Sequence, residues 1–349
     1  MLIYILLPFT PLLVQRLYRN IGSPDNLYHR YLMFSMLPMF FLIGFRADYI
    51  GADTIVYLRH FTNVLDTDLS VAIEQSRMEV GYIRFVKYIG QITSRPEVFQ
   101  LIYSAIYFIG FYSFAKLLSK DDGFIFVYFI ITLGIFFFLL TGVRQNIAMS
   151  ICLFSVQFLV KRKYLWVWLL VGLAYTFHKS SLLFLFAVLM FDRRLTKFNM
   201  ILYAVGIVII STYLVVFQNW ANDHFEYSYG IEETGNGGVF LLIVVAFTLL
   251  SWFYYKNYGK FTSIGRFLFN INILTLFLWI LRLQTRVAER PSLYFLSISC
   301  GLYACAYNYW SRDVNNGMLI RNGVIFLSYA LFVYRLLTNY ISIIPYAVF

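Results

Sequence analysis

The chain has 349 residues, of which 60% are hydrophobic and 13% are charged, and its formal net charge is +11. Soluble globular proteins are usually about 45–50% apolar and about 25% charged, so this composition excludes an ordinary soluble domain and indicates a membrane protein. The basic charge does not indicate nucleic-acid binding, because the Lys and Arg residues lie largely in short segments between apolar runs. We therefore expect the lipid bilayer, and no nucleic acid, as a partner.

Twelve apolar stretches follow one another along the chain, and several are shorter than the roughly 20 residues that cross a 30 Å hydrocarbon core upright. They predict an all-α polytopic membrane protein with about 12 transmembrane helices, some of them short or forming hairpins. We expect a single integral membrane domain over residues 1–349. The predicted spans cover residues 2–16, 31–45, 97–116, 124–141, 145–160, 164–177, 180–191, 198–217, 238–255, 265–281, 291–309 and 321–339.

Two of these regions require a turn. Residues 124–160 contain Arg144 as their one charged residue, and a single helix of that length would measure about 55 Å, too long for one crossing. Gly142 marks the expected turn. Residues 164–191 have basic residues on both flanks, which favours a hairpin with His178 at its tip, below the membrane surface and in a water-filled pocket.

The charge distribution predicts an orientation. Cytoplasmic loops of membrane proteins carry an excess of Lys and Arg, and six segments of this chain hold 16 of its 28 Lys and Arg residues. We assign these segments to the cytoplasm, which places the unusual polar residues on the periplasmic or outer face. The six segments are residues 16–30, 116–123, 161–163, 192–197, 256–266 and 310–321.

Two long segments then lie on the outer side. Residues 46–96 carry charges of both signs, and the spacing of Tyr82, Phe85, Ile89 and Ile92 predicts an amphipathic helix lying on the membrane. Residues 218–237 contain four acidic residues and no Lys or Arg, which is typical of a mobile loop and suits a lid.

Several polar residues near predicted span ends are candidates for binding or catalysis. Arg286 and Arg290 are four residues apart, so on a helix they share a face, and two guanidinium groups suit a diphosphate. Glu289 is expected to pair with one of them. Structural roles, such as an ion-paired helix end or a packed histidine, remain open for each candidate. The other candidates are Arg46, Asp48, Asp53, Tyr57, Glu79, Arg144, Gln145, His178 and Arg282.

The sequence has no phosphate-binding Gly-Lys loop, no HExxH motif and no Cys/His ligand set. It therefore gives no support to ATP-driven transport or zinc hydrolysis. We expect no metal and no cofactor.

In chain order, these segments resemble the EpsG-like branch of bacterial polysaccharide polymerases, the Wzy-type enzymes that make O-antigen, capsule or exopolysaccharide. The resemblance covers most of the chain, although the stretch from Arg282 to Arg290 is richer in arginine than the simpler family pattern. It rests on Arg46 to Tyr57 with Gly51 and Asp53, Glu79-Val80-Gly81-Tyr82, Arg144-Gln145, His178 with Ser180, and Arg286 with Arg290.

The resemblance implies a glycosyltransferase in the bacterial cytoplasmic (inner) membrane, with its active site facing the periplasm or cell exterior. It would move the growing glycan from undecaprenyl diphosphate to a sugar hydroxyl of a lipid-linked acceptor, and a chain-length regulator protein would be a partner. An O-antigen-ligase-type transferase shares this donor chemistry. A lipid-linked oligosaccharide flippase would instead carry polar residues along a central path between similar halves, and a purely structural subunit is the remaining alternative.

Roles follow from this reaction as hypotheses. Arginines would neutralise the charge that develops on the leaving diphosphate, and a carboxylate or imidazole would accept the proton of the acceptor hydroxyl. We expect the diphosphate to be bound by Arg46, Arg144, Arg286 and Arg290. The candidate bases, which the sequence does not rank, are Asp53, Glu79 and His178. The supporting residues are Asp48, Tyr57, Gln145, Arg282 and Glu289.

Overall fold

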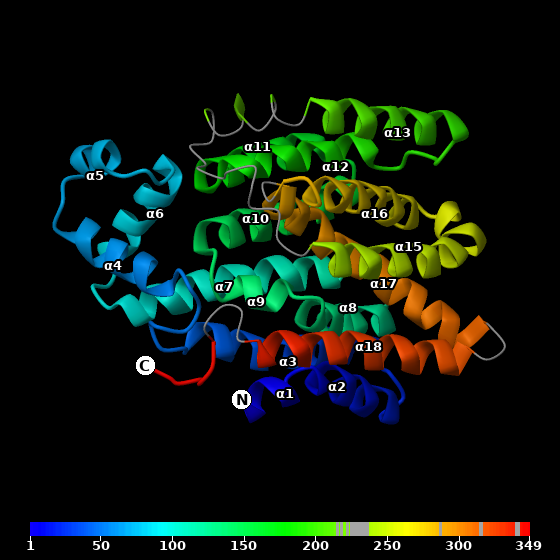
Figure 1. Ribbon diagram of the computed structural model, residues 1–349. Helices are drawn as coiled ribbons and strands as arrows, with labels where there is room; N and C mark the ends of the chain where they lie inside the picture. The colour runs from blue at the N-terminus through cyan, green and yellow to red at the C-terminus, as the bar shows by residue number, and fades with distance from the viewer. Residues whose placement is uncertain are drawn as a thin grey trace.

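The computed structural model describes residues 1–213, 216, 219, 220, 223, 237–285, 288–313, 317–338 and 343–349. In these residues the regular structure is helical, apart from an isolated β-bridge between Arg46 and Val348. The helices of the first half (Figure 1) are α1 (Leu2–Leu6), α2 (Phe9–Asn20), η1 (Asp25–Leu27), α3 (Tyr28–Gly44), α4 (Thr54–Leu65), α5 (Leu69–Gln75), α6 (Val80–Gly90), α7 (Pro96–Ala115), α8 (Lys120–Thr132), α9 (Ile135–Leu139) and α10 (Val143–Val160). Those of the second half are α11 (Tyr164–Phe177), η2 (Lys179–Phe184), α12 (Leu185–Met190), α13 (Lys197–Thr212), α15 (Gly238–Asn257), η3 (Gly259–Phe261), α16 (Ser263–Arg282), α17 (Glu289–Asp313) and α18 (Gly317–Leu337).

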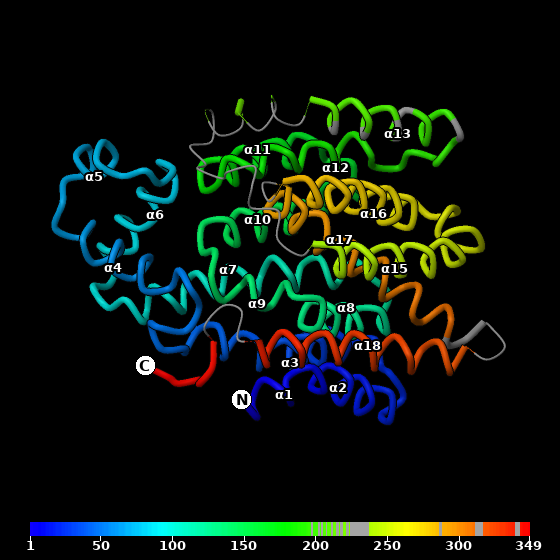
Figure 2. Tube along the Cα trace, in the orientation of Figure 1, coloured from blue at the N-terminus to red at the C-terminus, as the bar shows by residue number. Residues whose placement is uncertain are grey.

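Most of the longer helices lie side by side and share a common direction, as Figures 1 and 2 show. Helix α8 is buried on all sides from Asp122 to Thr132, because its apolar residues leave no polar face for solvent. Helix α17 packs against α8, α15, α16 and α18. Together α8 and α17 form the centre of the bundle, and α7 packs closely against α10 on the side that leads to the candidate site.

The chain reverses at two opposite ends of this bundle. The short helices α4, α5 and α6 project at the left end in Figure 1, whereas the connections from α2 to α3, α12 to α13 and α15 to α16 lie at the right end. Those connections contain the basic segments 16–30, 192–197 and 256–266 that the sequence assigns to one side of the membrane. The fold therefore separates these segments from the polar residues of α4 to α6.

Five helices among the described residues are long and apolar enough to cross a membrane, namely α7, α10, α15, α16 and α18. Helical structure lies at each of the twelve predicted spans, and α11 has the predicted bounds of residues 164–177. The all-helical class and the multi-pass membrane character are confirmed. The number of about twelve crossings stays a prediction, because the other helices do not meet the same limits of length and hydropathy.

The long apolar stretch over residues 124–160 breaks twice. The turn expected at Gly142 is present, since α10 begins at Val143. A second break, which the sequence did not predict, occurs at Gly134, whose φ of +97° lies in the left-handed region that favours glycine. Arg335 of α18 fills the space beside Gly134 and donates from Nη1 to the carbonyl oxygen of Leu133, 3.1 Å away. A cation inside the bundle thus satisfies a carbonyl at the end of α8.

The amphipathic helix predicted within residues 46–96 is α6. Its apolar face, which includes Tyr82, Val86 and Ile89, is buried against the rest of the protein. The predicted helix is present. Tyr82 and Ile89 of its predicted apolar face are buried against the protein, so the prediction that they lie on the membrane is wrong, and Ile92 lies beyond the end of α6 and is 67% exposed. Lys87 fixes α6 to α4 by donating to three backbone carbonyl oxygens at and just beyond the C-terminus of α4, those of Val64, Leu65 and Thr67.

The packing of α7 against α10 gives a stability test. A Cβ atom added at Gly110 of α7 would lie 2.6 Å from Cα of Ser150, so Gly110→Ala forces the helices apart and should lower the free energy of unfolding by about 1–3 kcal/mol. Thermal unfolding of the detergent-purified protein measures this effect. Gly323→Ala is the matched control, because a Cβ there meets nothing within 4 Å. Equal unfolding temperatures for the two variants would contradict this account of the contact.

Candidate functional site

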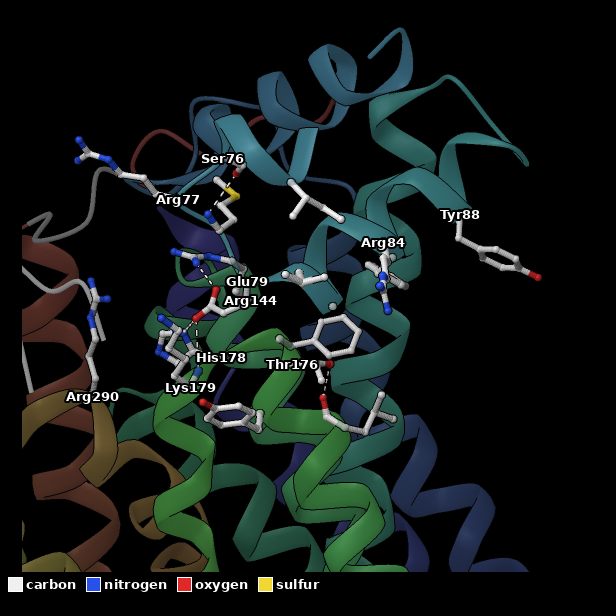
Figure 3. Close-up of a pocket in the computed structure, with 18 residues that line it drawn as sticks. Ser76, Arg77, Glu79, Arg84, Tyr88, Arg144, Thr176, His178, Lys179 and Arg290 are labelled. Carbon is white, nitrogen blue, oxygen red and sulfur yellow. Dashed lines mark hydrogen bonds and ion pairs between the residues drawn. The ribbon is translucent and has the colours of Figure 1, made fainter. Parts of the chain in front are cut away.

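A cavity of about 1010 Å³ lies where the segment before α6 meets α10, α11 and the start of α17 (Figure 3). Its wall contains five Lys or Arg side chains and, among the described lining residues, a single carboxylate. The cavity is therefore strongly cationic and suits an anionic ligand. The Arg, Lys, Glu and His residues that line it are Arg77, Glu79, Arg84, Arg144, His178, Lys179 and Arg290.

The carboxylate of Glu79 is the centre of this wall. One of its oxygens, Oε2, accepts a hydrogen bond from Nη1 of Arg144 in a close ion pair. The other, Oε1, lies 3.1 Å from Nδ1 of His178 and 3.3 Å from the backbone nitrogen of Lys179, which donates to it. Figure 3 shows the three side chains of Glu79, Arg144 and His178 directed toward one another. The structure thus brings together three residues that the sequence had singled out separately.

Local structure explains how these residues meet. Glu79 precedes the first residue of α6 in an extended conformation, Arg144 is in the first turn of α10, and His178 follows the last residue of α11. The contact of α6 with α11 requires Gly81, because a Cβ atom there would overlap both the side chain and the backbone of Thr176. The position of His178 at the turn between α11 and η2 agrees with the predicted hairpin tip.

Glu79 lies outside the membrane-spanning helices. Burial by itself would raise its pKa, but the hydrogen bond and electrostatic attraction of His178, together with the charge of Arg144, outweigh burial and lower the pKa from 4.5 to about 2. The carboxyl group is consequently ionised at neutral pH. An ionised carboxylate beside His178 favours the tautomer that carries its proton on Nδ1, which directs Nε2 to accept a proton.

Arg46 does not line the cavity. Its side chain is completely buried, and it donates from Nε to the carbonyl oxygen of Ile50 at 3.2 Å, from Nη2 to Oγ1 of Thr54 at 3.2 Å and from Nη2 to Oη of Tyr103 at 3.1 Å. It also donates to the carbonyl oxygen of Ile43. These partners place Arg46 in a structural network rather than beside the predicted diphosphate.

The motif around Arg46 instead supports the site from outside the cavity. Gly51 has a φ of +88°, and a Cβ atom there would overlap the carbonyl oxygen of Leu140, which accepts a hydrogen bond from Thr54 at 3.1 Å. This contact fixes the start of α4 to the turn before α10. From α4, Oη of Tyr57 then accepts a hydrogen bond of 3.4 Å from Nε of Arg144, so α4 is in contact with a cation of the cavity wall.

The two acids of the same motif lie elsewhere. Asp48 is exposed, and Asp53 is half-buried at the N-terminus of α4 without a capping hydrogen bond from its side chain. Neither residue lines the cavity. Of the three candidate bases, the structure therefore brings Glu79 and His178 to the cavity and leaves Asp53 outside it.

Arg290, in the first turn of α17, reaches the cavity from the opposite wall (Figure 3). Gln145, next to Arg144 on α10, donates from Nε2 to the carbonyl oxygen of Arg290 at 2.6 Å. This hydrogen bond links the two helices that carry the arginines. Glu289 pairs with Arg282, from Nε to Oε2 at 2.7 Å, and its expected pairing with Arg286 or Arg290 stays a prediction.

Two sequence predictions fall outside the described residues. One is Arg286, whose role in binding the diphosphate stays a prediction. The other is the mobile acidic loop at residues 218–237, of which the structure describes only residues 219, 220, 223 and 237.

Three cationic residues of the cavity were absent from the predicted site, namely Arg77, Arg84 and Lys179. Their sequence positions could have indicated them, since Lys179 follows His178 directly and the two arginines flank Glu79 within five residues. Within the described residues no group of three or more His, Cys, Asp or Glu is arranged to hold a metal ion. The cavity can bind an anion with several cationic groups and can accept a proton at an imidazole whose other nitrogen faces a carboxylate.

The low pKa of Glu79 predicts how the ion pair contributes to stability across pH. Because the pKa in the folded protein is below its ordinary value, the contribution is complete above about pH 4.5 and is lost as the pH falls toward about 2. Thermal unfolding of the wild type and of Glu79→Gln should differ by a constant amount between about pH 8 and 5.5, and the difference should shrink below about pH 4.5. A difference that closes near neutral pH, or persists unchanged in strong acid, would contradict this assignment.

Comparison with known proteins agrees with the resemblance seen in the sequence. A model described as the EpsG family matches residues 29–348, a range that contains every residue of the cavity. No curated protein and no solved structure matches the chain. Since the matched range covers most of its length, the chain belongs to the EpsG family.

Proposed function

We propose that the protein polymerises oligosaccharide repeat units carried on undecaprenyl diphosphate, at the outer face of the bacterial cytoplasmic membrane. Membership of the EpsG family supports a polysaccharide-polymerase function. The observation that carries the proposal is the cationic cavity in which the Glu79–His178 pair adjoins Arg144, Lys179 and Arg290. This combination offers a diphosphate site and a proton acceptor in one place.

The cations of the cavity bind the donor diphosphate in this mechanism. Arg144 uses Nε and Nη1 for its hydrogen bonds to Tyr57 and Glu79, and its other N–H donors would bind the diphosphate. Arg290 and Lys179 add two positive charges from other elements. As the bond between the anomeric carbon and the diphosphate breaks, negative charge grows on the leaving oxygen, and fixed cations stabilise it without reorganisation.

His178 is the base that fits this arrangement best. A carboxyl group with a pKa of about 2 is a weak proton acceptor near neutral pH, which argues against Glu79. His178 Nε2 takes the proton of the acceptor hydroxyl, the hydroxyl oxygen forms the new glycosidic bond, and the diphosphate leaves with the old bonding electrons. Glu79 holds the imidazole through Nδ1 and stabilises it once it is protonated.

The orientation supports the same reaction. The basic connections lie at the end of the bundle opposite α4 to α6 (Figure 1), and an excess of Lys and Arg favours the cytoplasmic side. The cavity then faces the periplasm or the cell exterior. At that face lipid-linked repeat units meet after they cross the membrane, and a chain-length regulator protein would act there.

Arg144→Gln and Arg290→Gln test the diphosphate site. Each variant should slow polymer formation from purified lipid-linked repeat units by about 100-fold or more, because each removes a cation that stabilises the leaving group. The measurement is the length distribution and yield of glycan made by protein in lipid nanodiscs. Arg59→Gln is the control, since Arg59 is an exposed arginine of α4 outside the cavity. Normal polymer from both cavity variants would overturn the proposal, and movement of intact lipid-linked units without transfer would favour a flippase.

Variants of His178 and Glu79 show which of the two residues is the base. His178→Gln removes the proton acceptor and should lower kcat by about 100- to 10,000-fold. Glu79→Gln keeps the imidazole and should lower kcat less, while the KM for donor lipid changes little because the diphosphate cations remain. Initial rates at varied donor concentration distinguish the two. A larger loss in Glu79→Gln than in His178→Gln would reverse the roles assigned here.

A further inference from the structure

We propose that Arg84, together with the exposed apolar face of α11, binds the acceptor lipid and thereby forms a second lipid-diphosphate site in the same cavity. This inference rests on the proposed function, because it divides the cavity between the two substrates of a polymerase. The observations are the position of Arg84, its lack of a protein partner among the described residues, and the continuity of the cavity with an apolar helix surface.

Arg84 is separated from the reaction centre. Figure 3 shows Arg84 on one side of the cluster formed by Glu79, Arg144 and His178, with Arg290 on the other side. Arg84 follows Glu79 by five residues along α6, which corresponds to about 7 Å along the helix axis. The cavity therefore holds the cations around Arg144 beside the candidate base, and Arg84 lies apart from them.

The reaction requires this separation. The anomeric carbon of the donor is bonded directly to its diphosphate, so the donor diphosphate must lie beside the base. The acceptor reacts through a hydroxyl on a sugar, whereas its own diphosphate is attached at the reducing end of the repeat unit. The acceptor diphosphate must then be bound away from the base, at a distance set by the repeat unit. Arg84 lies apart from the candidate base, and the cations around Arg144 lie beside it.

The side chain of Arg84 is available for this role. It is exposed, and no described residue forms a hydrogen bond or an ion pair with it. Val80 and Tyr88 lie one turn before and after it on the same exposed face of α6, and both line the cavity. An exposed arginine between apolar neighbours suits a phosphate group whose attached chain is apolar.

The exposed apolar face of α11 is the surface that suits the polyprenyl chain. Leu165, Leu169 and Leu173 recur every four residues on α11 and are 70%, 55% and 47% exposed, so they form one apolar stripe. Leu173 also lines the cavity, and so does Thr176 one turn later. The stripe is thus continuous with the cavity next to Gly81, where α6 and α11 meet. A lipid tail on this stripe places its diphosphate at Arg84.

The test uses donor and acceptor molecules that cannot exchange roles. The donor is a lipid-linked repeat unit whose accepting hydroxyl is methylated. One acceptor is the repeat unit on undecaprenyl diphosphate with a methylene group in place of the anomeric oxygen, and the other is the methyl glycoside of the same oligosaccharide. Full-length protein in nanodiscs is assayed for transfer to each acceptor, as wild type, Arg84→Gln, Arg84→Lys and the control Arg59→Gln.

Arg84→Gln should raise the KM for the lipid acceptor by about 10- to 100-fold, the effect of losing one charge-assisted contact. Transfer to the methyl glycoside should be unchanged, which also shows that the variant is folded, and Arg84→Lys should recover part of the affinity. An unchanged KM for the lipid acceptor in Arg84→Gln, or equal losses with both acceptors, would overturn the inference. Wild-type protein that transfers to neither acceptor would overturn the proposed function, and this inference with it.

Discussion

The arrangement of the site depends on the carboxylate of Glu79. It receives hydrogen bonds from Arg144 of α10, from His178 at the end of α11 and from the backbone of Lys179 at the start of η2. Two charged groups that are removed from water must compensate one another, since an unpaired buried charge costs several kcal/mol. Glu79 supplies this compensation from a segment outside the spanning helices, and in doing so it closes one wall of the cavity.

Cationic side chains in this protein have two kinds of environment. The difference is whether backbone carbonyl oxygens accept hydrogen bonds from them. Arg46, Lys87 and Arg335 each donate to backbone carbonyl oxygens near a helix end or turn. They satisfy acceptors that the fold would otherwise leave unpaired. Arg77 and Arg84 border a cavity instead, and among the described residues neither side chain donates to a carbonyl oxygen. A cation in a membrane protein is therefore informative about function only when its surroundings are known.

Much of this could be predicted from the sequence. Hydropathy located the helices, and the flanking charges and glycine located the turns at His178 and Gly142, because these signals are local along the chain. The break at Gly134 could not be predicted, since it depends on Arg335, which lies 202 residues from the carbonyl it binds.

The same limit applies within the candidate site. Periodicity showed that one face of α6 is apolar, but it cannot distinguish a membrane from a neighbouring helix as the surface that covers this face. Likewise, the residue types around Arg46 suit both an ion-binding site and a structural network, and only the positions of the Ile43 and Ile50 carbonyls decide between them.

The wide spacing of the Glu79 contacts has a consequence for biogenesis. Glu79 is 65 residues before Arg144 and 99 residues before His178. During synthesis the segment that carries Glu79 leaves the ribosome before its partners do, and contacts between distant residues form late. The nascent chain therefore holds Glu79 for a time without its two partners, and this wall of the cavity is completed only after the helical hairpin of α11 has formed.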